Sequence, residues 1–394
     1  MNPPPPAVAR RRFLSCCAAV TASFGAAALG AGIGACGSPG LAQVPVPSRA
    51  ADNSRTRRTV RFANWYDYID TSAGGGHPTL AEFTHQTGVQ VDYTELFADA
   101  DQPIGLIAAP LAVGREPGYD LIVTADWVLA EFLEHGWAAE LSPQVLSQAW
   151  RLLPRFRSWP IPGLPHYALP WQGGFTGIGY NPTLTRRPVT SMTELLTAPD
   201  LHGRVSLVSD MRDVMGLLLL DQGSDPASFT DHEFDTALAT LRHAITAGQV
   251  RLVSNDYIVA LAKGTIAAGV AWSGDILRAR QLNPALGFAW PKGGGMLWTD
   301  NMMIPALTPA RTNAERLMNF YYQPHVAAQL AVYNRFICPV LGAQAAMRQF
   351  DPGLAAERYI FPSPELLDSG HNFKILNRVL ATRYTTAFQG AVGL

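Results

Sequence analysis

The chain has 394 residues, of which 48% are hydrophobic and 15% are charged, so it holds ample apolar material for a core. This length favours two lobes or domains. The formal net charge is −1, which argues against a nucleic-acid partner because such proteins carry an excess of basic residues.

Residues 1–36 have the layout of a signal peptide. A basic cluster precedes an apolar run over residues 16–33, and residues 10–14 (RRRFL) resemble the twin-arginine export motif. A Sec leader is the alternative. The segment 33–36 (IGAC) resembles a lipobox, which makes Cys36 the expected lipidation site and membrane anchor. An incidental cysteine and a retained membrane anchor are the competing interpretations.

Residues 37–58 are rich in Pro, Ala, Ser and Arg and show no periodicity, so they are predicted to be a tether. The folded body is expected to begin at about Thr59. Once the leader is removed and Cys36 is lipidated, Cys338 is the one remaining cysteine. No disulfide framework is therefore expected.

Strands and helices alternate along the body. In its first part, strands are predicted at residues 60–65, 89–93 and 119–123, and helices at 79–86, 104–113 and 126–135. In its second part, strands are predicted at 205–208 and 266–272, and helices at 214–220 and 232–247. This alternation predicts an α/β fold with two lobes and a mainly parallel sheet covered on both faces.

Tryptophan and aspartate recur near the ends of the predicted strands. Ligands of such sheets gather at the carboxyl ends of the strands. Carboxylates bind ammonium groups, and indole faces pack methylenes and attract cations, so the pattern favours a site for a small organic cation. A core role for each tryptophan and an N-cap role for each aspartate are the alternatives. The residues are Trp65, Asp67, Trp127, Asp210, Asp213, Trp272, Asp275, Trp298 and Asp300.

Six segments in order resemble the spermidine/putrescine-binding proteins of bacterial ABC importers. They are residues 62–68 (FANWYDY), 119–123 (YDLIV), 176–181 (TGIGYN), 209–213 (SDMRD), 271–275 (AWSGD) and 290–300 (WPKGGGMLWTD). The resemblance implies a two-lobed periplasmic-binding-protein fold of type II with the ligand cleft between the lobes. It also implies an exported, monomeric binding protein in the periplasm or on the outer face of the cytoplasmic membrane. Such a protein needs no cofactor or metal, and its partners are a polyamine-like cation and an ABC permease.

The resemblance places the first lobe at residues 59–175 and 299–342, and the second at 176–298 and 343–394. Carried over position by position, the family's ligand contacts fall on Trp65, Asp67, Tyr68, Trp127, Asp210, Asp213, Trp272, Asp275, Trp298, Asp300 and Phe336. Asp300 is the expected main ammonium anchor. The chain departs from the family pattern at Ala125, Asp213, Phe336 and residues 369–373 by losing or shortening polar groups. These departures predict that the ligand is an amine other than spermidine or one that is less heavily charged.

Other functions are disfavoured without being excluded. A secreted hydrolase would need a nucleophile or metal motif, and the sequence has no GxSxG, HExxH or CxxC. Within the same fold, a sugar, a thiamine-like cation, an oligopeptide or ferric ion is an alternative ligand. A receptor that signals through the same lobes is a further alternative.

Overall fold

The computed structural model describes residues 50–98, 102–159, 161 and 166–393. The predicted leader, Cys36 and most of the predicted tether lie outside these residues. In the part of the chain that is described, none of the helices is both long and apolar enough to cross a membrane.

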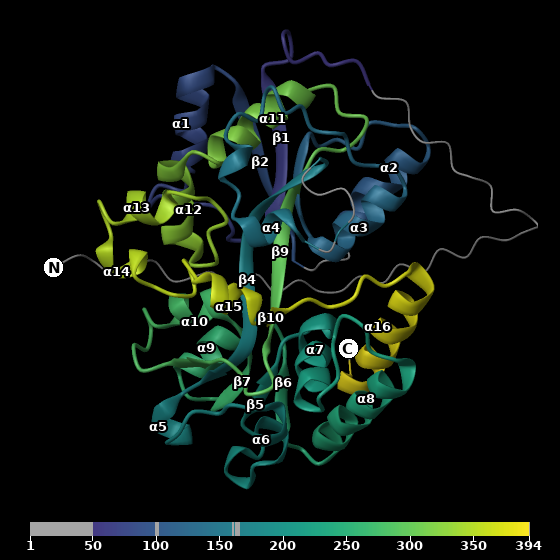
Figure 1. Ribbon diagram of the computed structural model, residues 1–394, viewed down its shortest axis with the longest axis vertical. Coiled ribbons are helices and arrows are strands. Elements are labelled where there is room, and N and C mark those ends of the chain that lie inside the picture. The colour runs from purple at the N-terminus through teal and green to yellow at the C-terminus, as the bar shows by residue number, and fades with distance from the viewer. Residues whose placement is uncertain (1–49, 99–101, 160, 162–165, 394) are drawn as a thin grey trace, which may run out of the picture. The chain divides into compact units, whose positions relative to one another are not determined.

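A single mixed sheet runs through the body, with the strand order β2-β1-β3-β9-β4-β7-β5-β6, β8 beside β4 and β10 beside β9 (Figure 1). The half with β1 to β3 is the first lobe, and the half with β5 to β7 is the second lobe. The strand bounds are β1 Thr59–Trp65, β2 Gln90–Phe97, β3 Leu121–Ala125, β4 Ala168–Tyr180, β5 Val205–Leu207, β6 Val250–Val253, β7 Ala268–Trp272, β8 Gly287–Ala289, β9 Gly295–Met303 and β10 Gly370–His371.

The sheet is parallel within each lobe and antiparallel between them. β1 pairs in parallel with β2 and β3, and β5 pairs in parallel with β6 and β7. β4 and β9 are antiparallel to each other, and each is antiparallel to its neighbour β7 or β3. The prediction of a mainly parallel sheet is thus wrong for the middle strands. There β4 and β9 carry the chain between the lobes in opposite directions and pair antiparallel.

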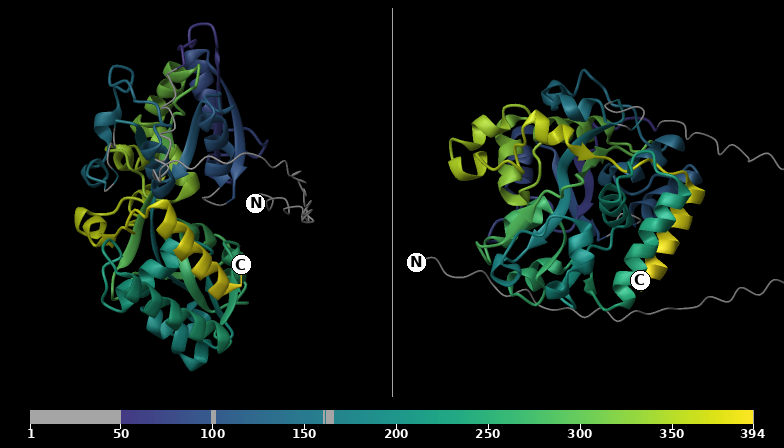
Figure 2. Two further views of the ribbon diagram at one scale, coloured as in Figure 1. Left: turned by 90° about the vertical axis from the view of Figure 1, so that its right-hand side faces the viewer. Right: turned by 60° about the horizontal axis from the view of Figure 1, so that its bottom comes forward.

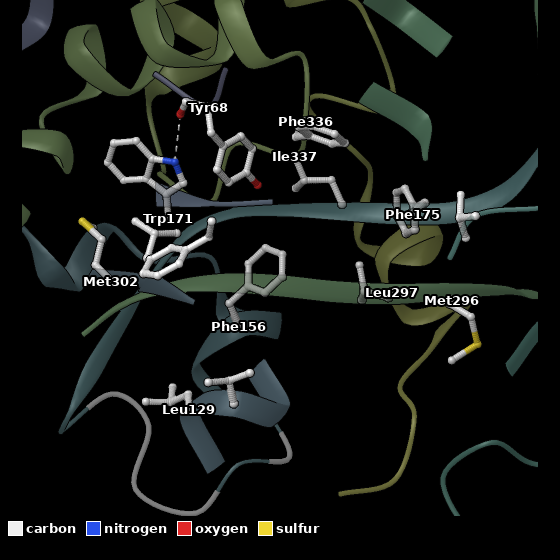
Figure 3. Packing of buried hydrophobic residues seen from close by; sticks show 14 of the residues in the cluster. Tyr68, Leu129, Phe156, Trp171, Phe175, Met296, Leu297, Met302, Phe336 and Ile337 are labelled. Atoms are coloured by element: carbon white, nitrogen blue, oxygen red, sulfur yellow. Dashed lines mark hydrogen bonds between the residues drawn. The ribbon is translucent and has the colours of Figure 1, made fainter. Parts of the chain in front are cut away.

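β4 and β9 cross from one lobe to the other (Figures 1 and 2), and their pairing extends from Ala168 opposite Met303 to Thr176 opposite Met296. β4 is buried along nearly its whole length. Figure 3 shows the apolar side chains packed around these two strands, with Tyr68 between Trp171 and Phe336. The indole Nε1 of Trp171 donates a hydrogen bond to the Tyr68 carbonyl, 3.3 Å away, which fixes the loop after β1 on the crossing strands.

Helices cover both lobes. The five predicted helices correspond, in chain order, to α1, to the π-helical turn η1 together with α2, to α3, to α7 and to α8. α1 ends at Gly88, as predicted, because this glycine adopts the left-handed conformation. The first-lobe helices are α1 Pro78–Thr87, η1 Ile104–Ala108, α2 Ala109–Ala112, α3 Asp126–Glu134, α4 Pro154–Arg157, α11 Arg311–Tyr321 and α12 Pro324–Asn334. The second-lobe helices are α5 Pro182–Thr185, α6 Met192–Thr197, α7 Met211–Asp221, α8 Asp231–Thr246, α9 Tyr257–Ala262 and α10 Ser273–Ala279.

The C-terminal part contributes to both lobes. It contains α13 Ala343–Met347, α14 Pro352–Ala355, α15 Pro364–Asp368 and α16 Arg378–Val392. α16 packs against α8 and α7 of the second lobe (Figure 1). α13, however, packs against α12 of the first lobe, whereas the sequence assigned everything after residue 342 to the second lobe.

The end of the predicted tether is attached to the body. The backbone N–H of Asn53 donates to the Pro309 carbonyl over 2.7 Å. The side-chain amide of Asn313, in α11, donates to the carbonyls of Ser54 and Arg57 over 2.9 and 2.8 Å. The prediction of a free tether up to residue 58 is therefore wrong from Asn53 onward, because Asn313 satisfies the backbone of this segment.

Candidate ligand-binding cleft

A cavity of about 900 Å³ lies between the two lobes and the crossing strands. All eleven predicted ligand contacts are in its lining, although they come from segments far apart in the sequence. The predicted residues are Trp65, Asp67, Tyr68, Trp127, Asp210, Asp213, Trp272, Asp275, Trp298, Asp300 and Phe336. The structure therefore brings the whole predicted set together in one cleft.

Asp300 lies in the middle of β9 and is partly buried. It was expected at the end of a strand. Instead its backbone is held on both sides, because β9 pairs with β3 and with β4 at this residue. The hydroxyl of Tyr68 donates a hydrogen bond to Asp300 Oδ2 over 2.9 Å. Burial raises the pKa of the Asp300 carboxyl to about 7.

Trp298, two residues earlier on β9, forms an aromatic wall with Phe336. The ring centroids are 5.3 Å apart, and the Trp298 indole N–H donates to the Thr176 hydroxyl over 3.1 Å. A side chain at Gly174 would overlap the Trp298 ring, and one at Gly274 would overlap the Phe336 ring. Both glycines thus leave room for an aromatic ring close to the backbone.

Asp213 is buried in the first turn of α7, where two donors hold its carboxylate. The Thr176 hydroxyl donates to Oδ1 and the Trp272 indole N–H donates to Oδ2, each over 2.6 Å. Burial, and to a smaller extent repulsion from Asp210, raises the pKa of Asp213 to about 8. Asp210 itself caps α7 by accepting from the backbone N–H groups of Arg212 and Asp213, so its N-cap interpretation is confirmed.

Asp275 lies in the first turn of α10, near the backbone of Trp272. The Tyr257 hydroxyl donates to Asp275 Oδ2 over 3.0 Å and accepts from the Trp272 backbone N–H over 2.9 Å. Burial raises the pKa of Asp275 to about 7. Asp213 and Asp275 are therefore linked to the two ends of the same tryptophan.

Asp67 has a different environment from the other aspartates. It is a non-glycine residue with a φ of 56°, and its side chain is 52% exposed. It forms an ion pair with Arg278 of α10 and accepts a hydrogen bond from the Tyr333 hydroxyl. Its carboxylate is already neutralised by the chain itself, and Asp67 connects the first lobe to the second.

Arg212 and Asp126 also line the cavity, and the sequence patterns did not single out either. The Arg212 guanidinium carbon, in the second lobe, lies 3.7 Å from the ring centroid of Trp127 in the first lobe. Burial raises the pKa of Asp126 to about 6, and attraction to Arg212 opposes that rise. Arginine is an expected partner for an indole face, but its position across the cleft has no local sequence signal.

The lining is strongly acidic and aromatic. Its acidic residues are Asp67, Asp126, Asp210, Asp213, Asp256, Asp275 and Asp300, and its basic residues are Arg212 and Arg278. Within the described part of the chain, no group of three or more His, Cys, Asp or Glu is arranged to hold a metal ion. Such a surface suits an organic cation that offers ammonium groups and methylenes together.

Comparison with known proteins agrees with this geometry. The family model described as "Bacterial extracellular solute-binding protein" matches residues 79–356. The spermidine/putrescine-binding periplasmic protein of Escherichia coli is 26% identical over 325 residues, which cover 82% of this chain and 88% of that protein. The resemblance that the sequence motifs indicated is therefore confirmed.

Solved structures show the same fold. A putative spermidine/putrescine ABC transporter protein from Listeria monocytogenes superposes with a TM-score of 0.74 at 23% identity, covering 85% of this chain and 98% of that one. The spermidine/putrescine ABC transporter substrate-binding protein of Streptococcus pneumoniae gives 0.71 at 21% identity, with 84% and 98% covered. The expected α/β, two-lobed periplasmic-binding-protein fold is confirmed. This chain belongs to the family of bacterial extracellular solute-binding proteins.

Proposed function

We propose that this protein is the solute-binding protein of an ABC importer and that it captures a polyamine or a related small organic cation. The observation that carries the proposal is the group of buried carboxylates of Asp213, Asp275 and Asp300. The hydrogen bonds that the structure shows to these carboxylates come from uncharged donors: Thr176 and Trp272 at Asp213, Tyr257 at Asp275 and Tyr68 at Asp300. Burial raises the pKa of each to about 7 or 8, so a bound cation that stabilises the ionised form would be favoured there.

The aromatic residues provide the second half of the recognition. Trp272 contacts Asp213 through its indole N–H, and Trp298 lies on β9 two residues from Asp300. An ammonium group near each carboxylate would thus place its methylenes beside an indole face. Each cation–indole contact contributes roughly 0.5–2 kcal/mol, more when water is excluded. The eleven residues predicted from the sequence are the proposed ligand contacts, with Asp67 acting through Arg278.

We further propose that the lobes move about the crossing strands β4 and β9. In an open form the cleft admits the ligand, and closure buries the ligand between the lobes and forms the surface that the permease recognises. The contacts of Arg278 with Asp67 and of Arg212 with Trp127 join the two lobes, so they belong to the closed form.

The competing ligands fit this cleft less well. A sugar would use the indole faces but has no cationic group to offset the three buried carboxylates. Ferric ion would need several oxygen ligands that converge on one point. The Tyr68 hydroxyl instead donates a hydrogen bond to Asp300. A thiamine-like cation remains the closest alternative, because it too combines positive charge with apolar surface.

A thermal-shift and calorimetric screen tests the proposal. The purified protein is titrated with putrescine, spermidine, choline, thiamine, maltose and ferric citrate. We expect polyamines to raise the melting temperature by mass action, with a Kd of about 1 μM, equivalent to about −8 kcal/mol. A shift with maltose or ferric citrate, together with none for any amine, contradicts the proposal.

We also propose that residues 1–36 direct export and that Cys36 carries a lipid anchor. The support is the order of the segments: a basic cluster, an apolar run and the lipobox-like IGAC. Cys36→Ser is expected to abolish incorporation of labelled palmitate and to release the protein from the membrane fraction. Replacing Arg10 and Arg11 by lysine is expected to block export if the twin-arginine route is used and to leave it intact if the Sec route is used.

A further inference from the structure

Asp256 is a cleft-lining aspartate whose carboxylate has no hydrogen-bond or ion-pair partner among the described residues. It is exposed, and although it occupies the N-cap position of α9, its side chain makes no capping bond. Each of the other six aspartates in the lining has at least one partner. These six are Asp67, Asp126, Asp210, Asp213, Asp275 and Asp300. Within the described chain, Asp256 is thus the cleft carboxylate that stays available to an incoming cation.

The backbone on both sides of Asp256 is fixed to other segments of the cleft. On one side, the backbone N–H of Ser209, in the segment that leads into α7, donates to Asn255 Oδ1 over 3.0 Å. On the other side, the Tyr257 hydroxyl donates to Asp275 Oδ2 over 3.0 Å. Asp256 lies between these two contacts, lines the cavity and is exposed to solvent. It therefore stands at the mouth of the cleft, on the second lobe, with its backbone held in place.

Exposure separates Asp256 from the carboxylates that are proposed to hold the bound amine. Asp213 and Asp275 are only 8% and 7% exposed. Burial raises the pKa of Asp213 to about 8 and that of Asp275 to about 7, so part of their charge is neutralised in the empty cleft near neutral pH. Their attraction for a cation that is still in solvent is correspondingly reduced. An exposed aspartate at the mouth instead extends its field into solvent, along the path by which a ligand enters.

We propose that Asp256 speeds the capture of the cation by attracting it to the mouth of the cleft, and that the buried carboxylates then hold it. This inference rests on the proposed function. The seven aspartates and two arginines of the lining give the cleft a negative field, and Asp256 is its solvent-facing part. Attraction of this kind raises the association rate constant without adding a contact to the complex, and salt screens it. Asp256 therefore controls how fast the ligand enters and leaves the dissociation rate constant unchanged.

Stopped-flow mixing with 1,4-diaminobutane tests the inference, with tryptophan fluorescence as the signal because Trp127, Trp272 and Trp298 line the cleft. Asp256→Asn is expected to lower the association rate constant about two- to fivefold at about 0.01 M salt, where the Debye length is about 30 Å. At about 1 M salt the Debye length is about 3 Å, and the difference from the unmodified protein should vanish. The dissociation rate constant should be the same in both proteins at either salt concentration.

Asp92→Asn is the matched control. Asp92 is exposed on β2, its carboxylate has no partner among the described residues, and it lies outside the cleft lining, so this variant loses the same charge and should keep the association rate constant. Asp256→Glu retains the charge and should also keep it. An association rate constant that is unchanged in Asp256→Asn, or that falls equally in Asp92→Asn, overturns the inference. Faster dissociation with unchanged association overturns it too, because Asp256 would then contact the bound ligand. If no polyamine binds the unmodified protein, the proposed function itself is wrong, so the two failures are distinguishable.

Discussion

The Tyr68 hydroxyl donates a 2.9 Å hydrogen bond to Asp300, although the two residues are separated by 232 positions in the chain. Tyr68 comes from the loop after β1 and Asp300 from the crossing strand β9. The bond orients the Asp300 carboxylate at the point where the lobes meet. The bond therefore connects the first-lobe loop after β1 to the strand that crosses into the second lobe.

Asp300→Asn is expected to weaken amine binding by about 1.5–3 kcal/mol, the usual contribution of a hydrogen bond to a charged group. The amide keeps the shape and can still accept from Tyr68 but carries no charge. Calorimetry with 1,4-diaminobutane measures the loss. Asp235→Asn is the control, because Asp235 is an exposed aspartate on α8 with a 3.7 Å ion pair to Arg383 and lies outside the cavity lining. An unchanged affinity in Asp300→Asn would show that Asp300 is not the anchor.

The affinity for an amine should rise with pH between about 6 and 8. The pKa values of Asp275 and Asp300 are raised to about 7, and that of Asp213 to about 8, so these carboxyls are partly protonated in the empty cleft near neutral pH. A cation binds the ionised form, so binding releases protons and becomes tighter as pH rises, by up to about tenfold per pH unit for each proton released. Titrations in buffers of different ionisation enthalpy measure the release. A dissociation constant that stays the same from pH 6 to 8 would rule out this linkage.

Stability of the ligand-free protein should change in the opposite direction. These three carboxyls have a higher pKa in the folded state than their ordinary value of 3.8, so the folded state binds more protons between about pH 4 and 8. Their contribution to the free energy of unfolding is complete below pH 4 and is lost as pH rises through 7 and 8. Calorimetric melting of the empty protein is expected to show a falling melting temperature from pH 5 to 8. Asp213→Asn should flatten the part of this slope between pH 7 and 8.

The sequence predicted the lining of the cleft well: Trp and Asp recur near the strand ends, and the family resemblance alone added Tyr68 and Phe336. It predicted the crossing strand β4 poorly. This strand is buried along nearly its whole length and contains several glycines, so it shows neither alternating polarity nor high strand propensity. The roles of Arg278 and Arg212 could not be predicted, since each contacts a residue of the other lobe.

Gly174→Ala should destabilise the fold by displacing the Trp298 ring. A methyl group at Gly174 would overlap the Trp298 ring, which must then move away from its place beside the Phe336 ring. Overpacking of this kind costs about 1–3 kcal/mol of stability. Gly390→Ala is the matched control, because a methyl group there meets nothing within 4 Å and Gly390 lies in the helix α16. Chemical denaturation should show a loss for the first variant and, for the second, a gain of about 0.5–1 kcal/mol.

The attachment of the N-terminal segment to α11 should protect it from proteolysis. Asn313 is fully buried, and its side chain holds the carbonyls of Ser54 and Arg57. Asn313→Ala removes both hydrogen bonds and leaves buried polar groups unsatisfied, at about 1–3 kcal/mol. Limited trypsin digestion of the folded protein should then cleave after Arg55 or Arg57 much faster than in the unmodified chain. Amine affinity should be unchanged, because this segment lies outside the cavity lining. Equal cleavage rates would mean that the segment detaches readily even with Asn313 in place.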